Sequence, residues 1–119
     1  MRGQWVVHQG KRMYIHDLTN LTPQTLEIET DISDLELQAE PLNSVCYLAN
    51  IAGTPGNLAT IDVFVRSSKK TEKHTRHIAV IGISGLRKSL VELFSRLSGK
   101  NCRMFDSLDA AKDWLASAD

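Results

Sequence analysis

The chain has 119 residues, of which 42% are hydrophobic and 24% charged, as is typical of a globular protein. This length predicts one domain over residues 1–119, with enough chain to bury a core. Fourteen Lys and Arg residues balance fourteen Asp and Glu residues. The resulting zero net charge argues against a nucleic-acid-binding protein, which usually carries a basic excess.

Neither a signal peptide nor a membrane span is indicated. The N-terminal sequence MRGQWVVHQGKR lacks an apolar core, and no apolar run approaches the roughly 20 residues of a transmembrane helix. Cys46 and Cys102 lie in apolar runs and form no CxxC pair, so we expect buried, reduced thiols. These features predict a cytoplasmic protein.

The chain begins with a predicted β-hairpin. Short β-like runs cover residues 4–8 and 12–17, and Gln9-Gly10 separates them. A glycine between two such runs is typical of a tight hairpin turn, because glycine adopts a positive φ without strain.

A helix is predicted next, over residues 23–38. Thr22 can accept a backbone N–H bond as N-cap, and Pro23 suits the first helical position. Three apolar residues recur at helical spacing: Ile28, Ile32 and Leu35. Pro41 then closes the helix.

The middle of the chain predicts a buried strand, a loop and a second helix. Residues 44–50 (SVCYLAN) form a nearly continuous apolar run, which suits a strand buried on both faces. Glycine and proline mark a loop over residues 53–57. Residues 58–68 fit either a helix or a strand, and their length and their position after a buried strand favour a helix.

The last third continues the alternation of strands and helices. A buried strand is predicted over residues 77–81, then a helix that ends near Gly99, then a strand over residues 102–105. The helix before Gly99 has an apolar stripe made of Leu86, Leu90, Leu93, Phe94 and Leu97. Asp106 or Ser107 caps a final helix. That helix is expected to bury Leu108, Ala111, Trp114 and Leu115.

This order of elements predicts an α/β fold. Strands that alternate with helices become parallel neighbours joined by crossovers, and the N-terminal hairpin adds an antiparallel pair. We therefore expect a mixed, mostly parallel sheet of four to five strands with flanking helices.

The zero net charge hides two segments of opposite sign. Six acids and no base lie from Glu27 to Glu40, whereas five bases and one acid lie from Arg66 to Arg76. Solvated helix faces are the ordinary explanation. The alternative is that the basic segment meets an acidic partner or an anionic membrane surface. The residues that would make the membrane contact are Arg66, Lys69, Lys70 and Lys73.

No complete catalytic motif is present. The turn at residues 82–86 (GISGL) approaches a G-x-S-x-G elbow but ends in leucine instead of glycine. The same turn offers an anion site, because free N–H groups at a helix start attract phosphate. Its members are Ser84, Gly85 and Arg87. His16-Asp17 could serve in acid–base work, but neighbouring strand residues point to opposite faces. The histidines and cysteines have no metal-ligand spacing, so we expect neither a metal nor a cofactor.

The loop after the central strand is a candidate site, because function in open α/β sheets collects at the carboxyl ends of strands. Thr54 places a hydroxyl there, in a segment expected to be exposed. The N-terminus of the following helix would favour a phosphate on that hydroxyl. A plain connecting loop is the alternative.

Two stretches of the chain resemble the SpoIIAA-like, or STAS-like, proteins of bacteria: AVIGISGL at residues 79–86 and FDSLDAAKDWL at residues 105–115. The strand at residues 45–50 and its glycine-bearing loop fit as well. The resemblance implies a sheet of four or five strands, flanking helices and a function that is not enzymatic. The best-known members are anti-anti-sigma factors, which bind a partner kinase and are switched by phosphorylation after the central strand.

Mapped onto this chain, that phosphorylation site falls at residues 50–56. The family pattern is Asp-x-Ser-Gly, but here Asn50 stands near the Asp position and Ala52 replaces the serine, so Thr54 is the candidate acceptor. The resemblance implies a surface for a kinase or sigma-regulator partner, made of Asn50, Gly53, Thr54, Gly56 and Asn57. On this hypothesis Thr54→Glu weakens partner binding and leaves the melting temperature unchanged.

The fold is also similar to the core of CRAL-TRIO lipid-transfer domains. That similarity implies an alternative function, as a carrier of a lipid or another small apolar ligand that works at a membrane surface. Such a carrier needs a mostly apolar cavity, which we expect under the helices at residues 58–68 and 86–97.

Overall fold

The computed structural model describes residues 2–82, 92 and 102–118. Five strands form a single sheet in the order β1-β2-β3-β4-β5. Their bounds are β1 Gly3–His8, β2 Lys11–Asp17, β3 Val45–Asn50, β4 Thr75–Ile81 and β5 Cys102–Phe105. β1 and β2 are antiparallel, and every other neighbouring pair is parallel. The predicted mixed, mostly parallel sheet is confirmed, with five strands.

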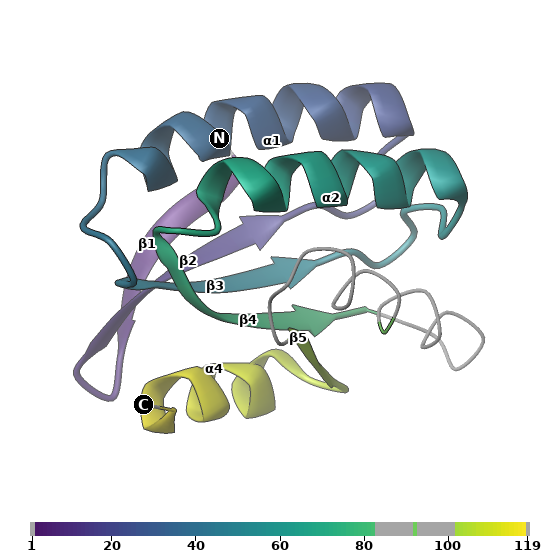
Figure 1. The fold of residues 1–119 in the computed structure, drawn as a ribbon. Coiled ribbons are helices and arrows are strands. Elements are labelled where there is room, and N and C mark those ends of the chain that lie inside the picture. The colour runs from purple at the N-terminus through teal and green to yellow at the C-terminus, as the bar shows by residue number, and fades with distance from the viewer. Residues whose placement is uncertain (1, 83–91, 93–101, 119) are drawn as a thin grey trace.

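Helices cover both faces of this sheet. α1 (Pro23–Gln38) and α2 (Leu58–Thr71) lie side by side on one face, and α4 (Leu108–Ser117) lies on the other (Figure 1). The ambiguous segment after β3 is therefore helical. The helix predicted before Gly99 lies outside the described residues. No helix in the described part of the chain combines the length and the apolar character that a membrane crossing requires.

Local sequence signals account for how these elements begin and turn. Gln9 and Gly10 both have a positive φ, of 52° and 79°, which is the geometry of a two-residue hairpin turn between paired strands. The Thr22 side chain accepts from Thr25 N at 3.2 Å and starts α1, with proline in the first turn. Ser107, the second of the two predicted candidates, caps α4 in the same way.

The core has one layer on each side of the sheet. Cys46 and Leu48 point toward α4, while Tyr47 and Ala49 point toward α1 and α2. This alternation follows from the period of two along a strand, and it confirms that β3 is buried on both faces. Cys46 is a buried free thiol. Burial raises the pKa of Cys46 and raises the pKa of Cys102 to about 12, so both remain protonated.

The apolar residues that predicted α1 do not face the core. Ile28 is 61% exposed and Leu35 is 72% exposed. The buried face of α1 consists of Leu26, Thr30, Ser33, Asp34 and Leu37. Small hydroxyl residues can be buried there because they bond to their own helix: Thr30 Oγ1 donates to Glu27 O and Ser33 Oγ to Thr30 O, both at 3.1 Å. The expected helix is correct, but its polar face is the one turned inward.

A second expectation about burial was also wrong. Leu108 is 39% exposed, because it is the first residue of α4 and lies at the end of the helix. Ala111 and Leu115 are fully buried against the sheet, as predicted, and Trp114 is half-buried beside them.

Candidate functional site

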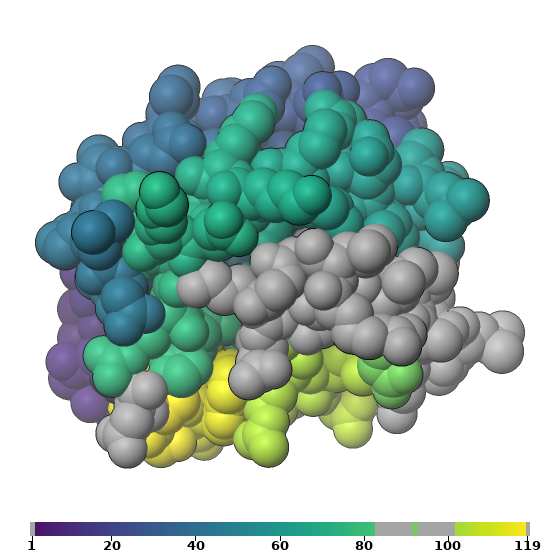
Figure 2. Space-filling model, in the orientation of Figure 1, coloured from purple at the N-terminus to yellow at the C-terminus, as the bar shows by residue number. Residues whose placement is uncertain are grey.

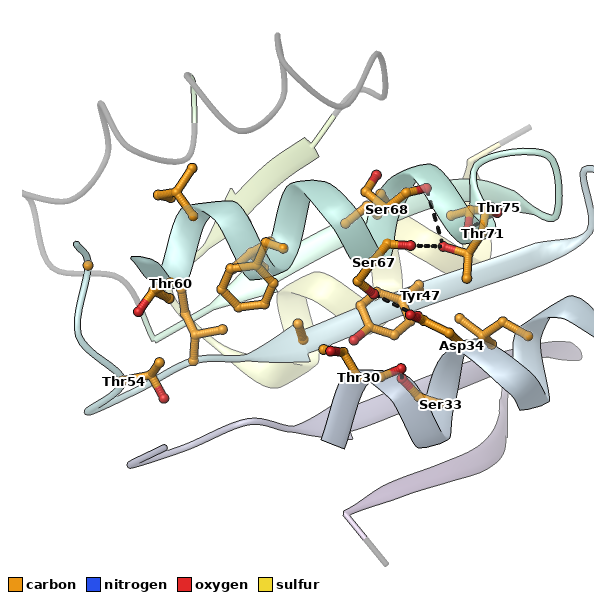
Figure 3. Close-up of a pocket in the computed structure, with 18 of the residues that line it drawn as sticks. Thr30, Ser33, Asp34, Tyr47, Thr54, Thr60, Ser67, Ser68, Thr71 and Thr75 are labelled. Carbon is orange, nitrogen blue, oxygen red and sulfur yellow. Dashed lines mark hydrogen bonds between the residues drawn. The ribbon is translucent and has the colours of Figure 1, made fainter. Parts of the chain in front are cut away.

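A pocket of about 80 Å³ lies between α1, α2 and the sheet (Figure 3). Most of its wall is apolar. Leu37 of α1 and the loop after β3 contribute to this wall, together with side chains from β3, α2 and β4: Ala49, Ile61, Phe64, Ile78 and Val80. A dry cavity of about 150 Å³ can hold a benzene molecule. The pocket has about half of that volume, so as it stands it has room for a molecule smaller than benzene or for one end of a larger one.

Among the described residues of this pocket wall, Asp34 is the one carboxylate. It lies on the buried face of α1 and is 3% exposed. Its Oδ1 accepts a hydrogen bond from Ser67 Oγ of α2 at 2.6 Å. Its Oδ2 is buried and has no hydrogen-bond partner among the described residues, and the same holds for Thr60 Oγ1 at the N-terminal end of α2. Because buried polar atoms are nearly always paired in folded proteins, these two atoms make the pocket a candidate site.

The burial of Asp34 changes its protonation. Desolvation raises the pKa of Asp34 to about 6, and the negative charge of Asp31 acts in the same direction. The hydrogen bond from Ser67 and the positive charge of Lys70 oppose the rise. At pH 7 the carboxylate is about 90% ionised, so the pocket contains a buried negative charge.

A second buried polar group supports the pocket floor. His16, on β2, is fully buried and places its Nδ1 2.8 Å from the Tyr47 hydroxyl and its Nε2 3.4 Å from Glu29 Oε1. Burial lowers the pKa of His16 and raises the pKa of Tyr47, so both side chains are neutral at pH 7. Since a carboxylate only accepts, Nε2 carries the proton and Tyr47 donates to Nδ1. Tyr47 also lines the pocket, so this network fixes one of its walls.

The acid–base pair considered from the sequence at His16-Asp17 does not form. The Asp17 carboxylate is exposed and accepts from Thr19 N at 3.1 Å and from Thr19 Oγ1 at 2.6 Å. The two neighbouring side chains point to opposite sides of the sheet, as the alternation along a strand requires.

Thr54 is buried, and the expectation of an exposed hydroxyl was wrong. It is 1% exposed. Its Oγ1 donates to Leu18 O at 2.5 Å and accepts from Leu21 N at 3.1 Å. The hydroxyl therefore joins the loop after β3 to the loop after β2. A kinase could reach it only after this loop opened, so phosphorylation of Thr54 stays a prediction.

The other loop residues mapped from the resemblance shape the backbone. Asn50 Oδ1 accepts from Ala52 N at 3.1 Å, and Asn57 Oδ1 accepts from Thr60 N at 2.9 Å as the cap of α2. Gly53 has a φ of +74°, and a Cβ added there would lie 2.0 Å from Asn20 Oδ1. Gly56 is exposed and lines the pocket together with Thr54. The loop predicted to bind a partner thus forms one end of the pocket.

The acidic and basic segments meet each other along α1 and α2. Arg66 binds Glu27 at 2.8 Å and Asp62 at 3.0 Å, and Lys70 binds Asp31 at 3.3 Å. Figure 2 shows the side chains of the two helices in contact along this seam. Within the described chain no ion pair involves Lys69 or Lys73, which are exposed. The expected contact with a membrane surface stays a prediction.

The remaining predicted site residues carry less information. Ser84, Gly85 and Arg87, the expected anion site, lie outside the described residues. Among the residues that the structure describes, no group of three or more His, Cys, Asp or Glu side chains is placed to hold a metal ion.

Sequence reasoning missed Asp34. Its signal was a second helical stripe that starts at Leu26 and ends at Leu37, with Thr30, Ser33 and Asp34 between them. This stripe has the same 3–4 spacing as the exposed apolar one. Polar residues on an inward face predict either a polar contact or a site, and here they form the pocket.

Comparisons with protein-family models and with curated proteins find no match. A solved structure of similar shape is the crystal structure of an uncharacterized protein from the DUF3478 family, with a SpoIIAA-like fold, from Shewanella loihica PV-4. The two structures agree with a TM-score of 0.75 over 95% of this chain and 91% of that chain, at 18% sequence identity.

The fold is SpoIIAA-like. The resemblance noted in the sequence is thereby confirmed at the level of the fold. At this low identity a structural likeness carries no information about activity, because one fold hosts many functions. The function of this SpoIIAA-like chain has to be argued from its own site.

Proposed function

We propose that this protein is a non-enzymatic binding protein for a small, mostly apolar molecule that occupies the pocket between α1, α2 and the sheet. This is the carrier alternative considered from the sequence. The observation that supports it is a mostly apolar pocket that contains a buried, unpaired carboxylate oxygen. Pockets of this composition, with few polar groups on an apolar wall, are typical of small-molecule sites.

The volume favours a small ligand over a long acyl chain. At about 80 Å³, the pocket would have to widen to hold a fatty chain. The wall that could yield lies between α1 and α2, because exposed ion pairs join these helices and exposed pairs contribute about 1 kcal/mol or less each.

Native mass spectrometry of the protein purified gently from its host tests the proposal. A bound species of a few hundred daltons or less is the expected result. Ala49→Ile fills the pocket floor and should abolish the adduct, whereas Ala110→Ile makes the same change on the exposed start of α4 and should retain it. An adduct that survives Ala49→Ile in a folded protein would contradict this site.

A second candidate is the regulatory role of the anti-sigma-factor-antagonist type, in which the loop after β3 binds a protein. The exposure of Gly56, Asn57 and Leu58 next to one another favours it. Co-purification of a kinase or sigma regulator that is lost in Leu58→Lys would support this role. Purification of the protein alone under gentle conditions would speak against it.

A further inference from the structure

We propose that the ligand of this pocket is a small aliphatic amine, whose ammonium group binds Asp34 Oδ2 while its alkyl chain lies against the apolar wall. This inference rests on the proposed binding function and names the chemical class of the ligand. It follows from a buried carboxylate oxygen in the pocket that has no donor among the described residues and from the charges around it.

The hydrogen bonding of Asp34 favours a ligand that donates. A carboxylate accepts but cannot donate. Ser67 already serves Asp34 Oδ1, while Oδ2 has no donor among the described residues. A ligand with a donor satisfies this atom. A ligand with a carboxylate or a ketone at its polar end leaves it unpaired and adds repulsion, so fatty acids are disfavoured.

The charges around Asp34 favour a ligand that carries a positive charge. The groups that face Asp34 are Asp31 on α1, Ser67 and Lys70 on α2, and Tyr47 on β3. Tyr47 is neutral and bonds to His16. The Lys70 ammonium lies 3.3 Å from Asp31 Oδ1, so its charge is shared with a second carboxylate. Two carboxylates, Asp31 and Asp34, thus face a single ammonium, and this excess of one negative charge favours a cationic donor over a neutral one.

The length of the pocket suits a short alkyl chain. Thr60 Oγ1, the other unpaired atom of the pocket, lies on the same helix as Ser67 and seven residues before it, or about 10 Å along the helix axis. Apolar side chains line the pocket between these two points. A short alkyl chain that starts at Asp34 therefore remains in contact with carbon along its length.

The experiment is an NMR titration of the ¹⁵N-labelled full chain with three probes of the same shape: n-butylamine, 1-butanol and butanoate. At pH 7.5 we expect the amine to shift the amide signals of pocket residues with a Kd about tenfold below that of the alcohol, because the ammonium adds the attraction of opposite charges to a hydrogen bond that the alcohol also makes. Butanoate should produce no shift.

Asp34→Asn should raise the Kd of the amine to that of the alcohol and leave the alcohol unchanged. The matched control is Asp109→Asn, which makes the same change at an exposed position of α4, on the other face of the sheet, and should keep the tenfold preference. If Asp34→Asn does not fold, the wild-type protein at pH 5 replaces it. Asp34 is then mostly protonated, since its pKa is about 6, and the amine should lose its advantage.

The two proposals fail in different ways. Equal binding of amine and alcohol in the wild type, or a preference that persists in Asp34→Asn, would overturn the amine assignment and leave the binding function in place. If none of the three probes shifts the signals of pocket residues, the amine assignment falls and the small-molecule function loses its support as well.

Discussion

Ser67 on α2 donates a hydrogen bond of 2.6 Å to Asp34 on α1, and this contact joins the two helices at the pocket. The bond accounts for one oxygen of a carboxylate that is almost completely buried. The other oxygen remains without a partner among the described residues. Asp34 therefore lowers the stability of the fold while it gives the pocket a group that can bind a ligand. The stability cost can be measured.

Asp34 should make stability fall as pH rises. Its pKa is raised from the ordinary value of 3.8 to about 6 in the folded state, so between these values the folded protein binds more protons than the unfolded one. The free energy of unfolding then decreases as pH rises from about 4 through 6. We expect Asp34→Asn to remove this decrease and to gain about 1–2 kcal/mol over wild type at pH 7.5, allowing for partial screening by solvent. Urea unfolding at pH 4 and pH 7.5 measures it, and equal pH profiles would contradict it.

Thr54 should tolerate serine but not valine or glutamate. Its hydroxyl bonds to both Leu18 O and Leu21 N in a buried position. Thr54→Ser keeps both bonds, whereas Thr54→Val leaves two buried backbone groups unpaired and should cost about 1–3 kcal/mol. Thr54→Glu buries a charge and should cost several kcal/mol, which reverses the unchanged melting temperature expected from the sequence. Thermal unfolding of the three variants decides, and a Thr54→Glu protein as stable as wild type would show that the loop opens readily.

The exposed face and the buried face of α1 should respond differently to substitution. Ile28 and Leu35 are largely exposed, so Ile28→Lys and Leu35→Lys should change the free energy of unfolding by only about 0.5 kcal/mol. Leu26 is fully buried, and Leu26→Ala should cost about 2–5 kcal/mol. Chemical denaturation of the three variants tests which face of α1 packs on the sheet. A large loss from either lysine variant would place that side chain in a contact.

Tyr47→Phe should destabilise the protein through His16. The hydroxyl lies 2.8 Å from His16 Nδ1, and its removal leaves that buried nitrogen without its donor at a cost of about 1–3 kcal/mol. Because burial lowers the pKa of His16, the unfolded state takes up more protons below about pH 6.5, and the contribution of His16 to the free energy of unfolding falls as pH drops, in the direction opposite to that of Asp34. The double variant His16→Leu/Tyr47→Phe removes both polar partners and should recover part of the loss. No recovery would contradict the pairing.

The elements of the fold could be predicted where short-range signals decide. The Gln9-Gly10 turn, the Thr22 cap and the alternation of strands and helices are local, and the structure confirms them within the described residues. The inward face of α1 could not be predicted in the same way. Ile28, Ile32 and Leu35 are the more hydrophobic stripe, but packing against Tyr47 and α2 selected the stripe with Thr30, Ser33 and Asp34.

The candidate site shows the same limit. The sequence predicted a loop with Thr54 and, as an alternative, a cavity under the helices at residues 58–68 and 86–97. The structure places this loop and the first of the two helices at one pocket, whose other helix is α1, while residues 86–97, apart from Glu92, lie outside the described residues. The sequence could not predict that the Thr54 hydroxyl is used up by backbone groups more than 30 residues away in the chain. In the sequence Asp34 belongs to the acidic segment, and its burial could not be predicted. The exposure of a carboxylate depends on which face of its helix packs on the sheet.

The ion pairs between α1 and α2 have a consequence for how the pocket opens. Arg66 with Glu27 and Lys70 with Asp31 are exposed pairs at the seam between the two helices. Dissolved ions weaken such pairs, since the screening length shortens from about 10 Å at 0.1 M salt to about 3 Å at 1 M. We therefore expect the helices to separate more often in concentrated salt, so that the exchange rate of a bound molecule reports the ionic strength around the protein.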